Sequence, residues 1–203
     1  MRDPAAARVF IVGKNQKNGF SVSKVGSHDH YMDTLFNRGT ETCRQLYDRV
    51  GKKSLTRNNI DTLARMLCER GVDDVLETNV ICFSTNSSGD FANGRNGSGK
   101  EVGMRLFSTL LKLIQPQVII AQGKSTAEYL GEHLGSPLPK PPEKPGDLDQ
   151  VDVGGTTIFI IPTLDPRHFP EWNLWRDAAE SGRSYLEGVC DRVVSVLDRG
   201  SPA

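Results

Sequence analysis

The chain has 203 residues, of which 37% are hydrophobic and 25% are charged, and its formal net charge at pH 7 is zero. This size and composition are typical of one globular domain and exclude a fibrous or intrinsically disordered chain. Apolar runs stay well short of the roughly 20 residues that a transmembrane helix needs, and the first residues lack the apolar core of a signal peptide. We therefore expect a single domain over residues 1–203, cytoplasmic and without a membrane partner.

Four short segments rich in apolar and β-branched residues predict the strands of a sheet. They span residues 8–13, 77–84, 117–123 and 156–163. Residues 9–12 and 158–161 are apolar at every position. Such unbroken runs indicate strands that are covered on both faces, as in a parallel sheet.

Between these segments, apolar residues recur every three or four positions and predict crossover helices. The helical stretches span residues 41–50, 57–70, 101–113 and 125–134. A longer amphipathic stretch over residues 174–197 predicts a C-terminal helix or pair of helices. Alternating strands and helices predict an α/β protein with three α/β/α layers around a central, mainly parallel four-stranded sheet. Closely spaced prolines predict an exposed loop over residues 137–149.

The cysteine and histidine residues form no pattern typical of a metal site or a disulfide framework. The four cysteines are far apart in the sequence and do not occur in closely spaced pairs; they are Cys43, Cys68, Cys82 and Cys190. We expect these to be small buried residues, without a zinc ion or other cofactor. His28 and His30 flank Asp29 in a glycine-bounded segment that indicates a solvated polar loop, because further ligands at metal-site spacing are missing.

In an open parallel sheet, ligands bind at the carboxyl ends of the strands, where loops lead into helices. The corresponding segments are residues 13–19, 85–100, 123–125 and 164–169. Their basic residues predict a local positive rim that a net charge of zero conceals. Candidate contacts to nucleic-acid phosphates are Lys14, Lys17, Arg95, Lys100, Lys124, Arg167 and His168.

Residues 94–100 satisfy the glycine and lysine spacing of a phosphate-binding loop of nucleotide hydrolases. Glu101 stands where that motif needs a magnesium-binding Ser or Thr, and roughly ten residues separate the loop from its strand. A nucleotide hydrolase is therefore disfavoured. Instead, the glycines are expected to let backbone amides approach a DNA phosphate, with added charge from Arg95 and Lys100.

Five short motifs occur at these segments in a fixed order. They read Gly13-Lys14-Asn15-Gln16, Phe36-Asn37-Arg38-Gly39, Thr78-Asn79-Val80-Ile81, Gln-Pro-Gln-Val-Ile-Ile-Ala-Gln-Gly over residues 115–123, and Asp165-Pro166-Arg167. Together they resemble the motifs of the uracil-DNA glycosylase superfamily, from about residue 8 to residue 169. The resemblance implies that superfamily's α/β/α fold and action on a base flipped out of DNA.

The first motif implies catalysis by Asn15, which would position the attacking water in the manner of the mismatch-specific branch. Gly13 and Gln16 are implied to border the base, and Gln16 replaces the usual proline. An Asn that only shapes a turn after a strand is the structural alternative. The iron–sulfur branches need four suitably placed cysteines, which this chain lacks, so no cluster is expected.

The next two motifs imply contacts to the extruded base. Phe36 is the implied stacking platform, with Tyr31 as a competitor, and Asn79 is implied to read the Watson–Crick edge. On general grounds Phe36 is equally suited to a core, so its role depends on the resemblance. An amide inside an apolar strand must find partners when buried, which suits either a ligand pocket or a structural bond for Asn79.

The closing motif departs from the family, which has His or Asn where this chain has Asp165. The family residue donates a hydrogen bond to the base oxygen that gains negative charge, and an ionised Asp165 would repel that oxygen. A protonated Asp165 donates instead, as a general acid, and favours an amino-bearing base such as a cytosine derivative over uracil. The alternative is that Asp165 caps a turn. Phe169 and Trp172 follow as a wedge into the base stack or as packing residues.

The resemblance implies a monofunctional DNA glycosylase that excises a damaged or modified base in DNA repair or in defence against phage, and we expect it to be a monomer. The rival prediction is a glycosylase fold that has lost catalysis and binds DNA or a protein. The changes at Gln16, Asp165 and Arg167 support this rival. Base excision from defined duplexes separates the two.

Overall fold

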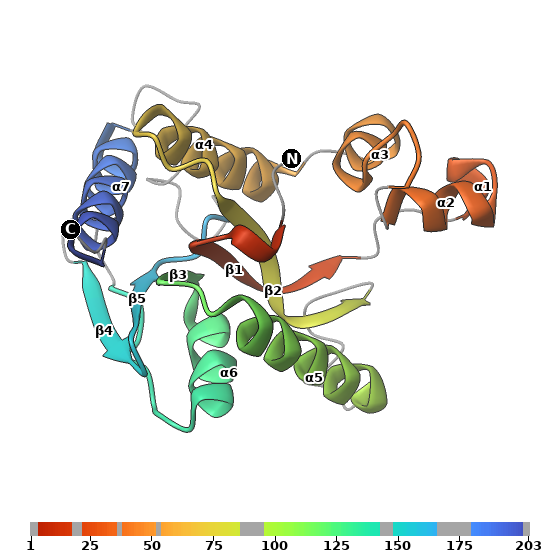
Figure 1. Ribbon diagram of the computed structural model, residues 1–203. Coiled ribbons are helices and arrows are strands. Elements are labelled where there is room, and N and C mark those ends of the chain that lie inside the picture. The colour runs from red at the N-terminus through yellow and green to blue at the C-terminus, as the bar shows by residue number, and fades with distance from the viewer. Residues whose placement is uncertain are drawn as a thin grey trace.

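The computed structural model describes residues 4–17, 22–35, 38–51, 54–85, 96–142, 148–165 and 180–200. Its centre is a five-stranded sheet in the order β2-β1-β3-β5-β4 (Figure 1). The strands are β1 (Val9–Lys17), β2 (Val75–Thr85), β3 (Val118–Gln122), β4 (Asp149–Val153) and β5 (Thr156–Ile161). The pairs β1–β2, β1–β3 and β3–β5 are parallel, and β4–β5 is antiparallel.

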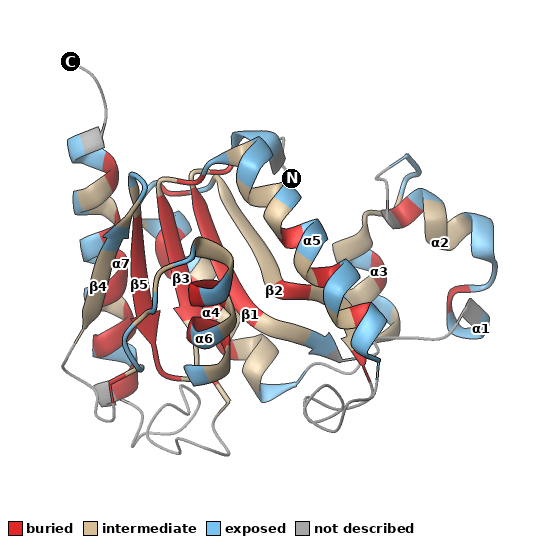
Figure 2. Ribbon diagram, turned by 90° about the horizontal axis from the view of Figure 1, so that it is seen from below, coloured by how far each residue is buried: buried red, intermediate tan, exposed pale blue. Residues whose placement is uncertain are grey.

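Helices cover both faces of this sheet, which confirms the predicted three-layer α/β/α architecture. The helices are η1 (Pro4–Ala6), α1 (Val22–Val25), α2 (His28–Leu35), α3 (Cys43–Val50), α4 (Leu55–Glu69), α5 (Gly97–Ile114), α6 (Lys124–Leu134) and α7 (Glu180–Gly200). α4 and α7 lie on one face, and α5 and α6 lie on the other (Figures 1 and 2). In the part of the chain that the structure describes, no helix combines the length and apolar character needed to cross a membrane.

The predicted sheet lacked its fifth strand. The strand β4 alternates polar and apolar residues and forms a hairpin with β5 through Gly154 and Gly155, whose φ angles of 59° and 86° are left-handed. Two adjacent positive φ angles are typical of the tight turns that join antiparallel strands. Within the predicted exposed loop, Pro137 and Pro139 are exposed, but Pro142 is buried and Leu138 packs against the core.

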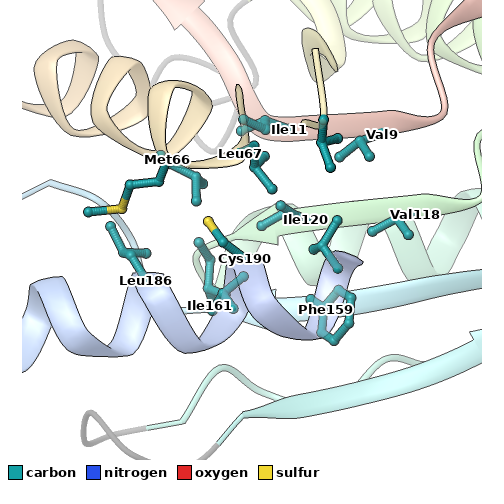
Figure 3. Packing of buried hydrophobic residues seen from close by; sticks show 14 of the residues in the cluster. Val9, Ile11, Met66, Leu67, Val118, Ile120, Phe159, Ile161, Leu186 and Cys190 are labelled. Atoms are coloured by element: carbon teal, nitrogen blue, oxygen red, sulfur yellow. The ribbon is translucent and has the colours of Figure 1, made fainter. Parts of the chain in front are cut away.

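The unbroken apolar runs of β1, β3 and β5 divide into two cores by simple alternation. Val9, Ile11, Ile120 and Phe159 pack with residues of α4 and α7 (Figure 3). Phe10, Val12, Ile119, Ala121, Ile158 and Ile160 pack on the opposite face with Phe107 of α5 and Leu130 of α6. Because successive side chains of a strand point to opposite faces, an all-apolar run is the pattern of a strand buried on both sides. The predicted burial of these strands is therefore confirmed.

The prediction that all four cysteines are buried is wrong for Cys68. Cys190 is fully buried in the core of α4 and α7, and this burial raises its pKa to about 12. Cys43 and Cys82 are half-buried, whereas Cys68 is exposed near the end of α4. Its position at the end of an amphipathic helix, outside the apolar stripe, explains the exposure.

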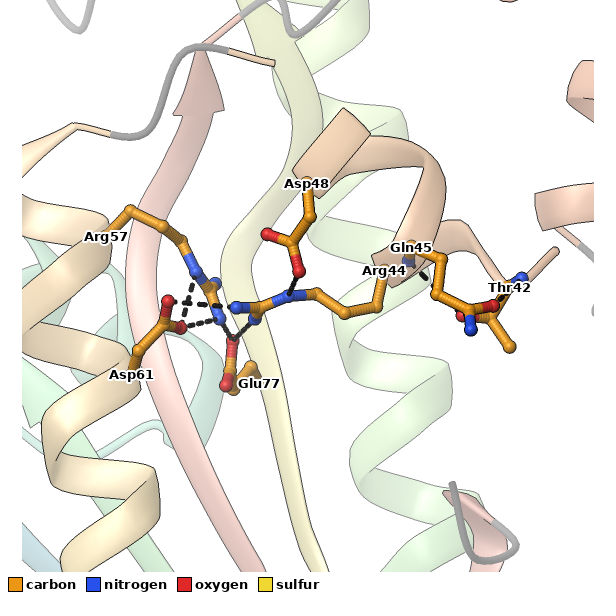
Figure 4. A network of polar contacts seen from close by, with 7 residues as sticks. All are labelled: Thr42, Arg44, Gln45, Asp48, Arg57, Asp61 and Glu77. Carbon is orange, nitrogen blue, oxygen red and sulfur yellow. Dashed lines mark hydrogen bonds and ion pairs between the residues drawn. The ribbon is translucent and has the colours of Figure 1, made fainter. Parts of the chain in front are cut away.

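A network of ion pairs joins α3 and α4 to the outer strand β2 (Figure 4). Glu77 of β2 contacts Arg57 of α4 and lies 3.8 Å from Arg44 Nη1 of α3. Asp61 forms ion pairs with both arginines: its Oδ1 lies 2.7 Å from Arg57 Nη2, and its Oδ2 lies 2.9 Å from Arg44 Nη2. The two arginines and two carboxylates hold one another in place, so a charged residue is accommodated in the middle of a strand.

The segment predicted as a solvated histidine loop is instead the helix α2, and His30 joins it to α3. His30 Nε2 lies 2.8 Å from Glu41 Oε2. The same carboxylate accepts hydrogen bonds from Arg49 Nε and Nη2, each at 2.8 Å. The hydrogen bond from Arg49, followed by that from His30, lowers the pKa of Glu41 to about 2.

This arrangement predicts an acid-sensitive contact between α2 and α3. Since the folded-state pKa of Glu41 lies below its ordinary value of 4.5, its stabilising contribution is complete above pH 4.5 and disappears as the pH falls to about 2. The carboxyl carbon resonance of Glu41 should titrate with a midpoint near 2, and Arg49→Gln should move that midpoint upward. A midpoint near 4.5 in the wild type would contradict the contact.

Candidate functional site

The candidate site begins on strand β1, which continues beyond the predicted loop start at Gly13. Gly13 pairs with Asn79, Asn15 with Ile81 and Lys17 with Thr85, with an irregularity in register between Asn15 and Lys17. Gly13, Lys14, Asn15 and Gln16 are therefore strand residues, and the expected loop after residue 13 is wrong. Extended pairing with β2 holds these residues more rigidly than a loop would.

Gly13 is the point at which two side-chain amides converge. A β-carbon added at Gly13 would lie 2.8 Å from Asn79 Oδ1 on β2 and 3.3 Å from Gln122 Nε2 on β3. Only glycine leaves this space open. The structure thus brings together the predicted Gly13 and Asn79, and it adds Gln122, which lies in the strand predicted over residues 117–123 and was not among the predicted site residues. The signal for Gln122 was a polar residue at the end of an otherwise buried apolar strand.

Asn15 lies two residues further along β1. Among the described residues, its side-chain amide forms hydrogen bonds through the nitrogen but not through the oxygen. Asn15 Nδ2 donates to Thr85 Oγ1 at 2.8 Å and to the carbonyl of Gln16 at 3.3 Å. Its Oδ1 is buried and finds no hydrogen-bond donor among the described residues. A buried acceptor without a donor is unfavourable unless water or a ligand supplies one. We call Asn15, Asn79 and Gln122, grouped around Gly13, the amide cluster.

The segment with Asp165 is held between α4 and the start of α6. The carbonyl of Leu164 accepts a hydrogen bond of 2.9 Å from Asn59 Nδ2, which lies in the buried face of α4. The Asp165 backbone N–H donates to Thr163 Oγ1 at 3.4 Å, and Gly123 packs closely against Thr163. Asp165 is half-buried, at the carboxyl end of β5. Arg167, His168, Phe169 and Trp172 lie outside the described residues.

Of the two predicted stacking residues, Phe36 lies outside the described residues, so its role stays a prediction. Tyr31 belongs to α2, which packs with α1 and α3 at the side of the domain (Figure 1). Its backbone N–H donates to the carbonyl of Ser27, and its carbonyl accepts from Thr34 Oγ1.

The predicted positive rim separates into two parts. Lys14 of β1 and Lys100 of α5 both approach the ring of Tyr129 on α6, with Nζ at 5.9 Å and 4.4 Å from the ring centroid. Lys124 is instead 3.8 Å from Glu128 Oε1 on its own helix. Only the backbone of Lys17 is described, and Arg95 lies outside the described residues. We call Lys14, Lys100 and Tyr129 the lysine cluster.

The glycine-rich segment before Lys100 has a packing role. Gly99 lies in the first turn of α5, and a β-carbon there would come within 2.5 Å of the Phe83 ring on β2. Gly99 therefore allows α5 to contact the sheet closely. The glycine spacing had instead predicted that the backbone amides approach a DNA phosphate. Residues 86–95 lie outside the described residues.

The two clusters differ in chemistry. The amide cluster supplies neutral donors and acceptors, which suit hydrogen bonds to the edge of a base or to another polar planar ligand. The lysine cluster supplies positive charge, which suits an anion. Among the described residues, no group of three or more His, Cys, Asp or Glu side chains could hold a metal ion.

Replacement of Gly13 by alanine tests the amide cluster. Gly13→Ala should displace the Asn79 and Gln122 amides and cost about 1–3 kcal/mol of stability, the usual range for an overpacked site. The side-chain amide resonances of Asn79 and Gln122 should shift. Gly188→Ala is the control, because nothing lies within 4 Å of an added β-carbon on that exposed face of α7. The control should stabilise the helix by roughly 0.5–1 kcal/mol, and unchanged amide resonances in Gly13→Ala would contradict the described packing.

Comparison with known proteins does not assign this arrangement to a family. No protein-family model matches the chain, and no curated protein matches it either.

Proposed function

We propose that the protein is a monofunctional DNA glycosylase that binds a base flipped out of DNA and hydrolyses its N-glycosidic bond. The observation that carries the proposal is the buried Asn15 Oδ1, which lacks a donor among the described residues and lies on the strand whose Gly13 meets the Asn79 and Gln122 amides. An acceptor of this kind can orient a water molecule, while the neighbouring amides bind a planar polar ligand. The order of motifs along the chain supports the same function.

In this mechanism the amides of Asn79 and Gln122 bind the edge of the extruded base. Each amide offers both a donor and an acceptor, so the pair can bind the amino group and ring nitrogen of cytosine as well as the ring N–H and carbonyl of uracil. The preference for an amino-bearing base therefore depends on Asp165, which when ionised would repel the oxygen of uracil and can accept from an amino group. Flipping costs a few kcal/mol and is least costly for a damaged or mispaired base. We therefore propose a damaged or modified base as the substrate, with a modified cytosine as the favoured case.

Asn15 would hold the attacking water through Oδ1 as the glycosidic bond breaks. Its hydrogen bond to Thr85 fixes which amide atom faces that water, because Nδ2 is already bound to Thr85 Oγ1. A neutral amide positions water but does not take a proton from it, so the reaction depends on a base that leaves readily. Asp165 would assist as the acid that hydrogen-bonds to the leaving base.

The role of Asn15 is tested by removing its amide. Asn15→Ala should bind substrate DNA but lose excision by about 10²-fold or more, the scale of a lost positioning group. Thr85→Val should lower kcat by a smaller factor with little change in KM, and Thr85→Ser, which keeps the hydroxyl, should restore it. Release of free base from duplexes is the measurement. A folded Asn15→Ala protein with wild-type excision would remove Asn15 from the mechanism.

The role of Asp165 is tested by substrate preference. Wild type, Asp165→Asn and Asp165→His are compared on duplexes that carry uracil, modified cytosines or deaminated purines. The wild type should prefer the amino-bearing base, and Asp165→His should gain excision of uracil because it can donate to the uracil oxygen. Efficient uracil excision that is the same in all three proteins would exclude the acid role. DNA binding without excision of any base would instead favour a binding module that has lost catalysis.

A further inference from the structure

Two lysine side chains from different elements meet at one aromatic ring on the face of the sheet that α5 and α6 cover. Lys14 Nζ lies 5.9 Å and Lys100 Nζ lies 4.4 Å from the centroid of the Tyr129 ring. Lys14 follows Phe10 and Val12 at intervals of two residues along β1. Because alternate side chains of a strand point to the same face, Lys14 lies on the face where Phe10 and Val12 pack with α5 and α6. A cation near an aromatic face is held there by the ring quadrupole. Both ammonium groups are thus placed by the fold.

The lysine cluster concentrates positive charge. Burial, followed by the charge of Lys100, lowers the pKa of Lys14, and Glu128 opposes this effect. The Glu128 carboxylate lies 3.8 Å from Lys124 Nζ, so it is shared with a third lysine. Like charges that the fold brings together are destabilising, and an anion between them would remove the repulsion.

The start of α5 adds to this positive character. Lys100 lies in the first turn of this 18-residue helix; that turn contains no acidic residue, and Glu101 follows it. The helix begins after Asn96, whose side chain forms no cap hydrogen bond. The first backbone N–H groups of a helix and its dipole attract anions. The helix start supports the same ligand class as the two lysines.

We propose that Lys14, Lys100 and Tyr129 form a binding site for one phosphate group, supplied either by the backbone of a nucleic acid strand or by a terminal phosphate. Phosphate fits because the two ammonium groups act as compact point charges from separate directions, whereas a planar carboxylate is better matched by the fork of an arginine. The Tyr129 ring keeps the lysine side chains extended toward the ligand. This site deepens the proposed function and, for a DNA phosphate, rests on it: of the basic residues expected to contact phosphates, it selects Lys14 and Lys100 and adds Tyr129.

The experiment measures the affinity for two short single-stranded DNAs of one sequence, one with a 5′-phosphate and one without. Lys14→Gln and Lys100→Gln should each weaken binding about tenfold, the equivalent of about 1.4 kcal/mol for one charge-assisted contact. Each should also reduce the salt dependence by about one phosphate contact. Tyr129→Leu should weaken binding without a change of charge, and Tyr129→Phe should not. Lys112→Gln is the matched control, because it removes an exposed lysine from the last turn of the same helix.

The two strands identify the source of the phosphate. Equal weakening for both strands assigns the site to a backbone phosphate, and weakening for the phosphorylated strand alone assigns it to a terminal phosphate. The Lys14 pKa, followed by the resonance of its Cε carbon, should rise in Lys100→Gln and also when the wild type binds DNA. Lys112→Gln should leave the Lys14 pKa unchanged.

The proposal is overturned if Lys14→Gln and Lys100→Gln weaken binding no more than Lys112→Gln does for either strand. Its outcome is separate from that of the proposed function. Phosphate binding without base excision would retain this site and reject the glycosylase, and base excision by a protein whose two lysine variants bind both strands as Lys112→Gln does would do the reverse.

Discussion

The structure depends on the burial of its central strands on both faces. Phe10, Val12 and Ile120 are completely buried. Phe10 and Val12 face the core formed with α5 and α6, and Ile120 faces the core formed with α4 and α7. A strand in this position cannot carry a polar side chain along most of its length without a large desolvation cost. On β1 and β3, the polar side chains of the two clusters therefore follow the buried apolar runs, at Lys14, Asn15 and Gln122.

Strand β1 also decides how these two clusters are separated. Its side chains alternate between the two faces, so Gly13 meets the Asn79 and Gln122 amides while Lys14 reaches Tyr129 and Lys100. Neutral hydrogen-bonding groups and positive charge are thus presented by adjacent residues of one strand but on different sides of it. In the proposed functions, a nucleotide would place its base and its phosphate on different sides of the same strand end.

The edges of the sheet are treated differently from its centre. On the β2 side, ion pairs add to the apolar packing and attach α3 and α4 to the sheet; they join Arg44, Arg57, Asp61 and Glu77. On the opposite edge, the short antiparallel β4 is more polar and partly exposed. A short polar edge strand limits pairing with other chains. The amide cluster spans the edge strand β2 and the central strands β1 and β3.

The amino-acid sequence by itself determined the fold class, the four parallel strands and the main crossover helices, because burial on both faces leaves an unbroken apolar run and a covering helix leaves a 3.6-residue period. It also identified Gly13, Asn15 and Asn79, which lie beside one another in the paired strands β1 and β2. The fifth strand, β4, was not predicted, because this edge strand contains no unbroken apolar run. Only the tertiary structure decided that β1 continues to Lys17 and that the Gln122 and Asn79 amides both lie next to Gly13. It also decided that Lys14 and Lys100 both approach the ring of Tyr129. These contacts join residues far apart in the chain, and local periodicity holds no information on which distant side chains meet at a shared sheet edge.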